Sequence, residues 1–560
     1  MYQRIEGGIF LTNETLYRIL LGVVLVLAAV AAGLHYFVED DAFISFRYAK
    51  NFAEGNGLVW YHDLREFGFT NFIFTVAVAL LSYIGLNPET AAFILTFPAF
   101  LASVMLTVQL SLMVGSSKKV ALITGLVVGT HYTISSYASS GMETAVQMML
   151  VLATYVQIFR YTEGKHHVSP WGIGASAALA LLCRLDSALL LFYAYLYLLA
   201  YHFRQWRMQG NAYVGQRTVW LPSAVMVLVP IGAVAAMMGW SYWYYGSALP
   251  NTYYAKFGVV GEFISEGLQY GYSYLQAECF FPLVLLALTC VTCLEAAIRK
   301  LAVNPKVLYL IGACFLWWIY IISIGGDFME FRLLVPMLPL FYVGCFGMIE
   351  TVLDHRKVRF WCAMAVVCVG VNIAHGFVFE YGNILVDSVK RLNGLVRKDE
   401  PNWTVTGTSL RKLFYTGGPD DVVLALHPVG AIPYYSGLVT VDEFGLNDRW
   451  VALYGVPGRI MAGHRRRAPF NYMVDRGVNL LIDFPKYYCP DTSTMVPKRY
   501  YWVPLIMIPL DGGCYLLANY LKPHEKVDRL IAEGKIRRIP PDAAKSEDGD
   551  YYTIGIPPFN

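Results

Sequence analysis

The stretch that decides the fold is "VEDDAFISFRYAKN", residues 38–51, which directly follows the first apolar run of the chain. Three adjacent carboxylates, Glu39, Asp40 and Asp41, stand there in a chain with only 15% charged residues. The run before them, residues 20–38, is close to the ~20 residues that a helix needs to cross a bilayer. Because it has no small-residue cleavage site, we interpret it as an uncleaved membrane anchor. The carboxylates are therefore expected at the mouth of a membrane helix.

The composition agrees with a membrane protein. The 560 residues are 56% hydrophobic and 15% aromatic, with a mean hydropathy of +0.46. Apolar runs of membrane-spanning length recur through the first two-thirds of the chain, which indicates a polytopic α-helical membrane protein. The net charge of +3 is too small, and basic residues too scattered, to indicate a nucleic-acid partner.

Basic residues fall in five breaks between apolar runs, and the positive-inside rule places these breaks in the cytoplasm. The segment 70–86 would spoil the alternation if it crossed the bilayer, so we interpret it as a juxtamembrane helix in the outer interface. The N-terminus is then cytoplasmic. The breaks hold Lys118 and Lys119; Arg160 and Lys165; Arg204, Arg207 and Arg217; Arg299, Lys300 and Lys306; and Arg356, Lys357 and Arg359. The eleven predicted spans are 20–38, 90–113, 119–138, 144–160, 170–183, 187–202, 219–240, 279–297, 307–325, 333–350 and 360–378.

A second domain is predicted after the membrane module of residues 1–379, whose outer loop covers 39–89. From residue 380 hydropathy falls, and the β-rich runs "VVLAL", "LVTVDEF" and "NLLIDF" alternate with helical stretches. Residues 380–560 are therefore expected to form an α/β domain outside the cytoplasm. Cys489 and Cys514 lie in this polar region and could form a disulfide there.

The carboxylates at 40 and 41 allow three interpretations. They could cap the following helix, at its positive dipole end. Adjacent acids in a partly desolvated pocket could instead hold one proton between them, which suits a general base. They could equally bind a divalent cation. The sequence alone leaves the base and the metal interpretations open.

Other predicted outer breaks supply matching cations, carboxylates and tyrosines. Cations at the headgroup level suit a lipid-linked phosphate, and carboxylates suit the hydroxyl groups of a sugar. Each residue also has a simpler interpretation: a local Arg184–Asp186 ion pair, a helix cap at Glu143, or interfacial anchors among the tyrosines and cations. The candidates are Arg47, Glu143, Arg184, Asp186, Asn251, Tyr253, Tyr254, Lys256, Asp327, Glu330 and Arg332.

The combination of motifs resembles a known family. "DDAFISFRYAKNFAEGNGLVW", "TNF", "SGMETA", "RLDS", "GGDFMEFRLLVP", "VDEFGLND" and "GRIMAGH" are similar to the mycobacterial terminal arabinofuranosyltransferases and to bacterial enzymes that put arabinofuranose on type IV pilins. These belong to the GT-C glycosyltransferases, which use polyprenyl-phosphate sugars as donors. The resemblance runs from residue 38 to about 465. It departs at "EFGFTN" and "RLDS", where the family would have "EGYTN"-like and "RPDG" sequences.

The resemblance implies a GT-C fold and a pentosyltransferase of the bacterial plasma membrane. The implied donor is decaprenyl- or undecaprenyl-phosphoryl arabinofuranose, and the implied acceptor is a surface glycan or a pilin. Asp40 or Asp41 would be the base, and Arg184, Lys256 and Arg332 would hold the departing phosphate. Asp327 and Glu143 would orient sugar hydroxyls.

Residues of the C-terminal domain and two other functions stay open at this stage. Asp442, Asn447, Asp448, His464 and Arg465–Arg467 could meet the acceptor, or could only fix the domain to the membrane portion. A transporter or flippase of lipid-linked sugars, a GT-C enzyme for another sugar such as mannose, and a non-enzymatic envelope scaffold are the alternatives. A transporter would have polar residues in the middle of several helices, whereas here they gather at the outer breaks.

Overall fold

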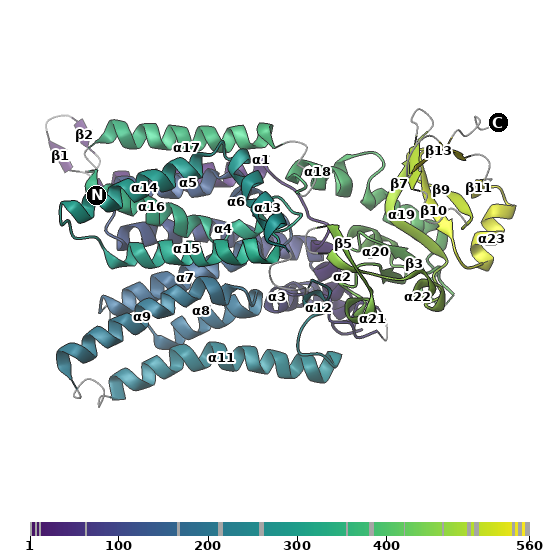
Figure 1. Cartoon of the computed structure of the whole chain (residues 1–560), viewed down its shortest axis with the longest axis horizontal. Helices are drawn as coiled ribbons and strands as arrows, with labels where there is room; N and C mark the ends of the chain where they lie inside the picture. Colours follow the sequence, from purple (N-terminus) through teal and green to yellow (C-terminus); the bar gives the residue numbers. More distant parts are fainter. Residues whose placement is uncertain are drawn as a thin grey trace.

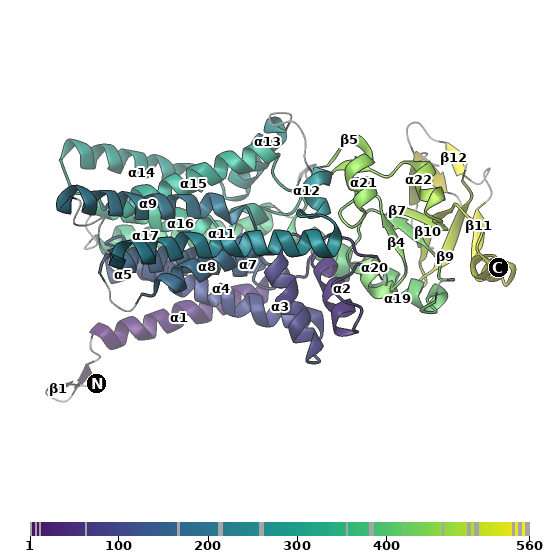
Figure 2. The same ribbon diagram turned by 90° about the horizontal axis from the view of Figure 1, so that it is seen from below.

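The computed structural model shows an elongated molecule, with a helical bundle at one end and a mixed α/β domain at the other (Figures 1 and 2). The structure describes residues 3–5, 8–10, 13–61, 64–164, 168–210, 217–256, 263–353, 357–379, 386–418, 420–461, 464–489, 494–497, 503–539, 544–546 and 551–554. Lys165 and Arg356 of the predicted basic breaks lie outside these residues.

Every predicted span coincides with a helix of the bundle. Six of these helices, α1, α4, α11, α14, α15 and α17, are long and apolar enough to cross a membrane. The bundle consists of α1 (Asn13–Leu34), α4 (Pro88–Met113), α5 (Lys118–Thr130), α7 (Thr144–Thr162), α8 (Pro170–Cys183), α9 (Ser187–Gln209), α11 (Arg217–Tyr245), α14 (Phe281–Ile298), α15 (Pro305–Ile324), α16 (Leu338–Val352) and α17 (Val358–Val378).

Several predicted boundaries were wrong, because hydropathy ignores the residues that start and stop helices. Helix α1 begins at Asn13, with Glu14 at its positive dipole end, and stops at Leu34. The span 119–138 is split into α5 and a short α6 (Tyr132–Ser136), with His131 extended between them. The span 333–350 starts with a 3₁₀ turn, Arg332–Leu334, and its helix α16 carries Pro339 in its first turn.

The segment 70–86, predicted as an interfacial helix, contains one short helix. Helix α3 (Phe72–Tyr83) has 12 residues, or about 18 Å of helix at 1.5 Å per residue, against about 30 Å of hydrocarbon. It packs on α2 (Ala42–Ala53), the helix that starts in the acidic stretch. Helix α3 therefore lies beside the acidic stretch, and its place in the membrane interface stays a prediction.

The basic breaks meet at the end of the bundle where α1 starts, far from the α/β domain. Lys118 pairs with Glu14 at 2.6 Å, and Lys306 pairs with Glu163 at 2.5 Å. The N-terminus also lies at this end (Figure 1). The acidic stretch and the α/β domain lie at the opposite end (Figure 2). The breaks that alternate along the sequence thus lie at opposite ends of the folded bundle.

The α/β domain is built on a six-stranded sheet with the order β11-β9-β10-β7-β3-β4. Strands β3, β4 and β7 are parallel and lie in the three predicted β-rich runs, whereas β9, β10 and β11 pair antiparallel. The strands are β3 (Leu424–Leu426), β4 (Thr440–Asp442), β7 (Leu480–Tyr488), β9 (Leu505–Pro509), β10 (Tyr515–Tyr520) and β11 (Arg537–Ile539). The domain's helices are α18 (Val389–Asn393), a π-helix (Gly394–Lys398), α19 (Trp403–Phe414), α20 (Ala431–Ser436), α21 (Arg449–Tyr454), α22 (Phe470–Asp475) and α23 (Glu525–Ala532).

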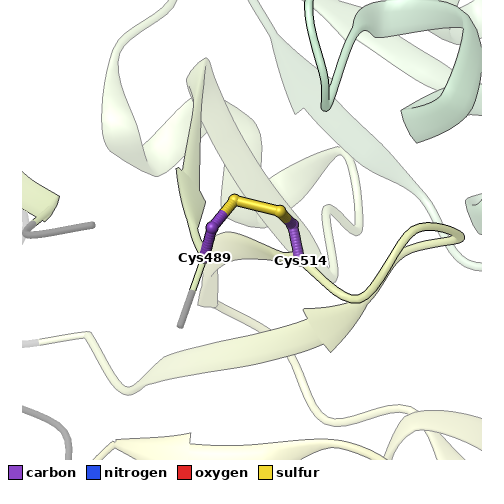
Figure 3. The surroundings of a disulfide bond; sticks show 2 residues. All are labelled: Cys489 and Cys514. Atoms are coloured by element: carbon purple, nitrogen blue, oxygen red, sulfur yellow. A yellow bond between two sulfur atoms is a disulfide. The ribbon is translucent and has the colours of Figure 1, made fainter. Parts of the chain in front are cut away.

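Smaller elements complete the fold. Helices α12 (Asn251–Lys256) and α13 (Ile264–Ala277) connect α11 to α14. The remaining strands form small sheets: β1 (Gln3–Ile5) with β2 (Gly8–Phe10), β5 (Val456–Met461) with β6 (His464–Arg467), and β12 (Ala544–Ser546), β13 (Tyr551–Ile554) and β8 (Thr494–Pro497). Cys489 and Cys514 form a disulfide beside β7 and β10, with 4.4 Å between their Cα atoms (Figure 3).

The outer loop of the membrane module packs as part of the α/β domain. Phe43 and Trp60, both fully buried, share one apolar core with Leu424 and Ile506 of the sheet. The helices of the bundle have a separate core. The acidic stretch therefore lies at the boundary between two cores, where side chains from both can meet.

Candidate active site

A cavity of about 510 Å³ lies between the bundle and the α/β domain. Its walls come from α2, the start of α3, the α8–α9 turn, α11, α12, α15 and the loop after α15. Apolar side chains from these elements, such as Leu181, Met237 and Ile324, alternate with charged ones. The charged lining residues are Asp41, Glu143, Arg184, Asp186, Lys256, Asp327, Arg332 and Arg465.

The two adjacent aspartates have different surroundings. Asp41 lines the cavity, and its side chain makes no hydrogen bond that would cap α2. Burial raises the pKa of its carboxyl group, while Arg332 and Lys256 oppose that rise. Asp41 is therefore an acid beside cations, with a pKa above the ordinary value of 3.8.

Asp40 points away from the cavity, into the α/β domain. Its Oδ1 accepts a hydrogen bond from the Ala431 amide at 2.7 Å, and its Oδ2 accepts one from the Gly430 amide at 3.1 Å. A Cβ atom on Gly430 would lie 1.9 Å from the Asp40 carbonyl oxygen, so only glycine allows this approach. Asp40 thus anchors the start of α20 to the acidic stretch. The pair does not act as one unit.

Glu39 stabilises the backbone of the acidic stretch. It is fully buried, and its Oε1 accepts the Asp40 amide at 3.1 Å. Burial raises the pKa of Glu39 well above its ordinary range, and the neighbouring Asp41 and Asp40 raise it further. Burial therefore favours the protonated form of Glu39 more than that of an exposed glutamate.

The loop "GGDFMEFR" places an ion pair in the cavity. Gly325 and Gly326 adopt positive φ of 85° and 75°, which favours glycine and turns the chain sharply after α15. Asp327 then pairs with Arg332 at 2.6 Å, and both side chains are buried. The guanidinium group of Arg332 has more N–H donors than one carboxylate accepts. It can therefore also contact a second anion in the cavity.

Glu330, in the middle of that loop, is held from the bundle. Its Oε1 lies 2.6 Å from His375 Nε2 on α17, and its Oε2 accepts the Val389 amide. His375 Nδ1 in turn lies 2.7 Å from Glu278 Oε1. Glu278, Glu330 and His375 are all fully buried. Glu330 therefore fixes the loop and does not line the cavity.

Arg184 joins three elements at the cavity wall. It bonds Asp186 at 2.7 Å within its own turn, as the simpler interpretation expected, and Glu143 at 2.8 Å across the bundle. Glu143 also accepts a hydrogen bond from Asn71 at 2.8 Å and makes no cap bond to α7. Arg184 and Arg332 lower the pKa of Glu143 despite its burial. This carboxylate is charged and held in place.

Two further cations complete the lining. Lys256, at the end of α12, has no ion-pair partner among the residues that the structure describes. Arg465 bonds Glu266 at 2.5 Å and lies 3.7 Å above the Phe263 ring. Burial lowers the pKa of Lys256. Its ammonium group is the lining cation that is most available to an incoming anion.

Four predicted sugar- or acceptor-binding residues lie outside the cavity lining: Arg47, Tyr254, Asp442 and His464. Arg47 donates to the Trp60, Pro433 and Leu438 carbonyl oxygens at 2.9, 2.6 and 3.3 Å, which joins α2 to the α/β domain. Asp442 accepts the Asn447 and Phe444 amides at 2.7 and 2.8 Å and so shapes its own loop. Tyr254 packs against the core of the α/β domain.

Other predicted residues have mixed outcomes. Tyr253, Asp186 and Asp327 line the cavity. His464 packs between the rings of Phe328 and Phe444, beside the lining residue Arg465. Asp41 and Glu143 are the N-cap residues of α2 and α7, but neither side chain makes a cap hydrogen bond.

Sequence reasoning missed the supporting residues. Asn71 stands in the "TNF" motif, but Glu266 and Phe263 had no signal beyond their residue types, because their role depends on partners distant in the chain. Arg465 stood in a run of three arginines whose side chains diverge in the structure: Arg466 donates to the Gly455 carbonyl oxygen, and Arg467 bonds Asp483. The alternation of side chains along a strand could have separated these roles.

The fold is that of the GT-C class of membrane proteins. ArnT from Cupriavidus metallidurans in the apo state is similar over 91% of this chain and 98% of its own, with a TM-score of 0.53 and 12% identity. ArnT bound to undecaprenyl phosphate gives 0.50 over the same shares, also at 12% identity. The Archaeoglobus fulgidus oligosaccharyltransferase tethered with an acceptor peptide gives 0.51 and 11%, over 92% of this chain and 75% of that one.

Sequence comparisons add one family. Residues 401–520, in the α/β domain, match a family model described as a domain of unknown function, DUF8728. No curated protein matches the chain. The identities of 11–12% with the solved structures establish the fold alone.

Proposed function

We propose that the protein is a membrane glycosyltransferase that moves a sugar from a polyprenyl-phosphate donor to an acceptor hydroxyl outside the cytoplasm. The observation that carries this proposal is the cavity in which Asp41 meets Arg184, Lys256, Arg332 and Arg465. A base and a set of cations are the two groups that transfer from a sugar phosphate requires. Undecaprenyl phosphate in ArnT and the acceptor peptide of the archaeal enzyme support this reading of the fold.

In the proposed reaction Asp41 takes the proton of the acceptor hydroxyl while its oxygen attacks the anomeric carbon of the sugar. The bond from that carbon to the phosphate oxygen breaks, and the phosphate leaves on the lipid with the electron pair. Cations near this oxygen stabilise the developing charge. Lys256 and Arg332 are best placed for this, since both act on Asp41 in the same cavity. The carboxyl oxygens of Glu143 and Asp327 can orient sugar hydroxyls with their remaining acceptor capacity.

A divalent cation, if the enzyme uses one, would bind at Asp41 and not between Asp40 and Asp41. Asp40 lies outside the cavity lining, with its two oxygens at the Gly430 and Ala431 amides, so it does not share the cavity with Asp41. Lining carboxylates such as Asp327 could supply further ligands, although Arg332 competes for them.

The particular sugar follows from the sequence resemblance. We propose D-arabinofuranose as the donor sugar and a surface glycan or pilin as the acceptor, with mannose or another polyprenyl-phosphate sugar as the alternative. The site would then lie on the outer face of the bacterial plasma membrane. A flippase is the second candidate function. The clustering of charged lining residues at one end of the bundle, rather than along a path through it, favours the transferase.

The test is transfer by the full-length protein in detergent from decaprenyl-phosphoryl arabinofuranose, compared with a polyprenyl-phosphate mannose. We expect Asp41→Asn to lower transfer by at least ~10²-fold, the typical contribution of a general base. Asp511→Asn is the matched control, because this exposed carboxylate pairs with Lys412 on the domain surface. Undiminished transfer by a folded Asp41→Asn variant would remove Asp41 from the mechanism. Lipid movement across vesicles without transfer would favour the flippase.

A further inference from the structure

A second cluster of metal-ligand groups lies in the α/β domain, outside the cavity lining. His427 directly follows β3, Glu443 directly follows β4, and Asp483 lies in β7. One ligand atom of each lies within 4.8 Å of the other two. In an open sheet, the carboxyl ends of parallel strands form the crevice where ligands bind, at the point where the chain reverses its direction of winding. Strand β3 lies between β4 and β7 and marks that point.

Glu443 is the member whose surroundings require a ligand. It is fully buried. Neither carboxylate oxygen has a hydrogen-bond partner within the part of the chain that the structure describes. The nearest groups are His427 Nε2 at 3.3 Å and Arg467 Nη2 at 3.6 Å from its Oε2. A buried carboxylate without a donor is costly, so an unsatisfied oxygen aimed into a cluster indicates a cation there.

The contacts of His427 cannot all be satisfied by protons. Its Nε2 lies 2.5 Å from Asp483 Oδ1 and 2.8 Å from Arg467 Nη2. If Nε2 carries a hydrogen, it can donate a hydrogen bond to Asp483. The N–H group of Arg467 then lies against another donor. If Nε2 carries none, it accepts from Arg467, but its lone pair then faces the Asp483 oxygen. A metal ion would use the lone pairs of Nε2, Oδ1 and Oε2 together.

We propose that His427, Glu443 and Asp483 bind one divalent transition-metal ion, with Zn²⁺ or Mn²⁺ as the fitting class. One imidazole nitrogen and two carboxylate oxygens suit these ions. Arg467 lies where the ion would sit, 2.8 Å from Asp483 Oδ1, and neutralises the carboxylates until it is displaced. The ion would connect the carboxyl ends of β3, β4 and β7. This site is independent of the proposed transferase function.

The site bears on the cavity through β6. Arg467 ends β6, and Arg465, two residues earlier on the same strand, lines the cavity. The ring of Phe444, next to Glu443, stacks on His427 at 4.3 Å and contacts His464 at 4.7 Å. An ion that displaces Arg467 would therefore fix the strand from which Arg465 reaches the cavity.

The test is titration of the chelator-treated, full-length protein in detergent with Zn²⁺, followed by calorimetry and by metal analysis after gel filtration. We expect one equivalent at this site, bound at least tenfold more weakly by Glu443→Gln. Arg467→Gln should bind at least threefold more tightly, because it removes a competing charge without removing a ligand. His524→Ala, in the same domain, should match the wild type, because His524 caps α23 away from the cluster.

The outcomes separate this site from any ion at the cavity. Loss of the equivalent in Glu443→Gln but not in Asp41→Asn supports the cluster. Loss only in Asp41→Asn overturns it, as does a wild-type protein that binds no Zn²⁺ or Mn²⁺. If Glu443→Gln does not fold, Arg467→Gln decides: tighter binding supports the site, and unchanged or absent binding overturns it.

Discussion

At the scale of single residues, the two aspartates of the acidic stretch have different roles. Asp40 and Asp41 are neighbours in sequence, but successive side chains at the start of a helix point in directions about 100° apart. Asp40 reaches the amide groups before α20, and Asp41 reaches the cavity. One is a structural anchor, and the other is the candidate base. Substitutions at the two positions should therefore have different effects.

The first prediction concerns the anchor. Asp40→Ala leaves the buried Gly430 and Ala431 amides without an acceptor, which costs about 1–3 kcal/mol for each unsatisfied group. We expect a lower midpoint of thermal unfolding in detergent for Asp40→Ala than for Asp41→Asn. Equal midpoints for the two variants would contradict the anchor role.

The second prediction concerns pH. The base must be ionised, and burial raises the pKa of Asp41 above 3.8. Transfer should therefore fall as the pH drops through a pKa above that value. Lys256 favours the ionised form of Asp41, so Lys256→Gln should move the acid limb of kcat/KM to higher pH. The measurement is the pH profile of transfer for both proteins. A limb that stays in place or moves to lower pH would contradict the assignment.

At the scale of elements, the loop 325–335 connects the bundle to the cavity. Its ion pair, Asp327 and Arg332, lines the cavity, and its middle residue, Glu330, is fixed by His375 of α17. The hydrogen bonds run from Glu278 through His375 to Glu330 and on to the Val389 amide at α18. A change at His375 should therefore reach the cavity without touching it.

The third prediction tests that support. His375→Ala removes both hydrogen bonds of the imidazole and leaves Glu278 and Glu330 buried without it. We expect a higher KM for the lipid donor and a lower kcat, whereas His375→Gln, which can still donate one hydrogen bond, should recover part of the activity. The pH limb assigned to Asp41 should stay in place, because His375 is not the base. An unchanged KM in His375→Ala would show that the loop does not depend on this residue.

At the scale of the whole molecule, the two ends differ in their charged groups and in their packing. The basic breaks gather at the end where α1 begins, and the cavity lies at the end that carries the α/β domain. The positive-inside rule predicts that the first end lies in the cytoplasm, and we propose that the cavity opens to the outside.

The fourth prediction is a test of that orientation. Asp511→Cys in the α/β domain and Arg299→Cys after α14 place thiols at exposed positions at the two ends. A membrane-impermeant maleimide added to spheroplasts should label the cysteine at position 511 and spare the one at position 299. The parent chain, with its own cysteines, sets the background. Labelling at position 299 alone would reverse the topology and remove the site from the outer face.

Much of the architecture was determined by the sequence alone. The order of the bundle helices, the short α3, and the positions of β3, β4 and β7 follow from local patterns of apolar residues and turns, which depend on neighbours within a few positions. The residue types of the cavity were also predictable, because charged groups at membrane boundaries are rare and costly.

Only the tertiary structure decided which of these residues meet. It gave Asp40 and Asp41 different surroundings, and it placed Arg47 and Asp442 in structural hydrogen bonds. It also brought Arg465 of the α/β domain into the cavity lining. It also joined His427, Glu443 and Asp483 from three strands. The physical reason is that a local pattern fixes the face of an element on which a side chain lies, whereas its partner is set by the packing of elements that are hundreds of residues apart in the chain.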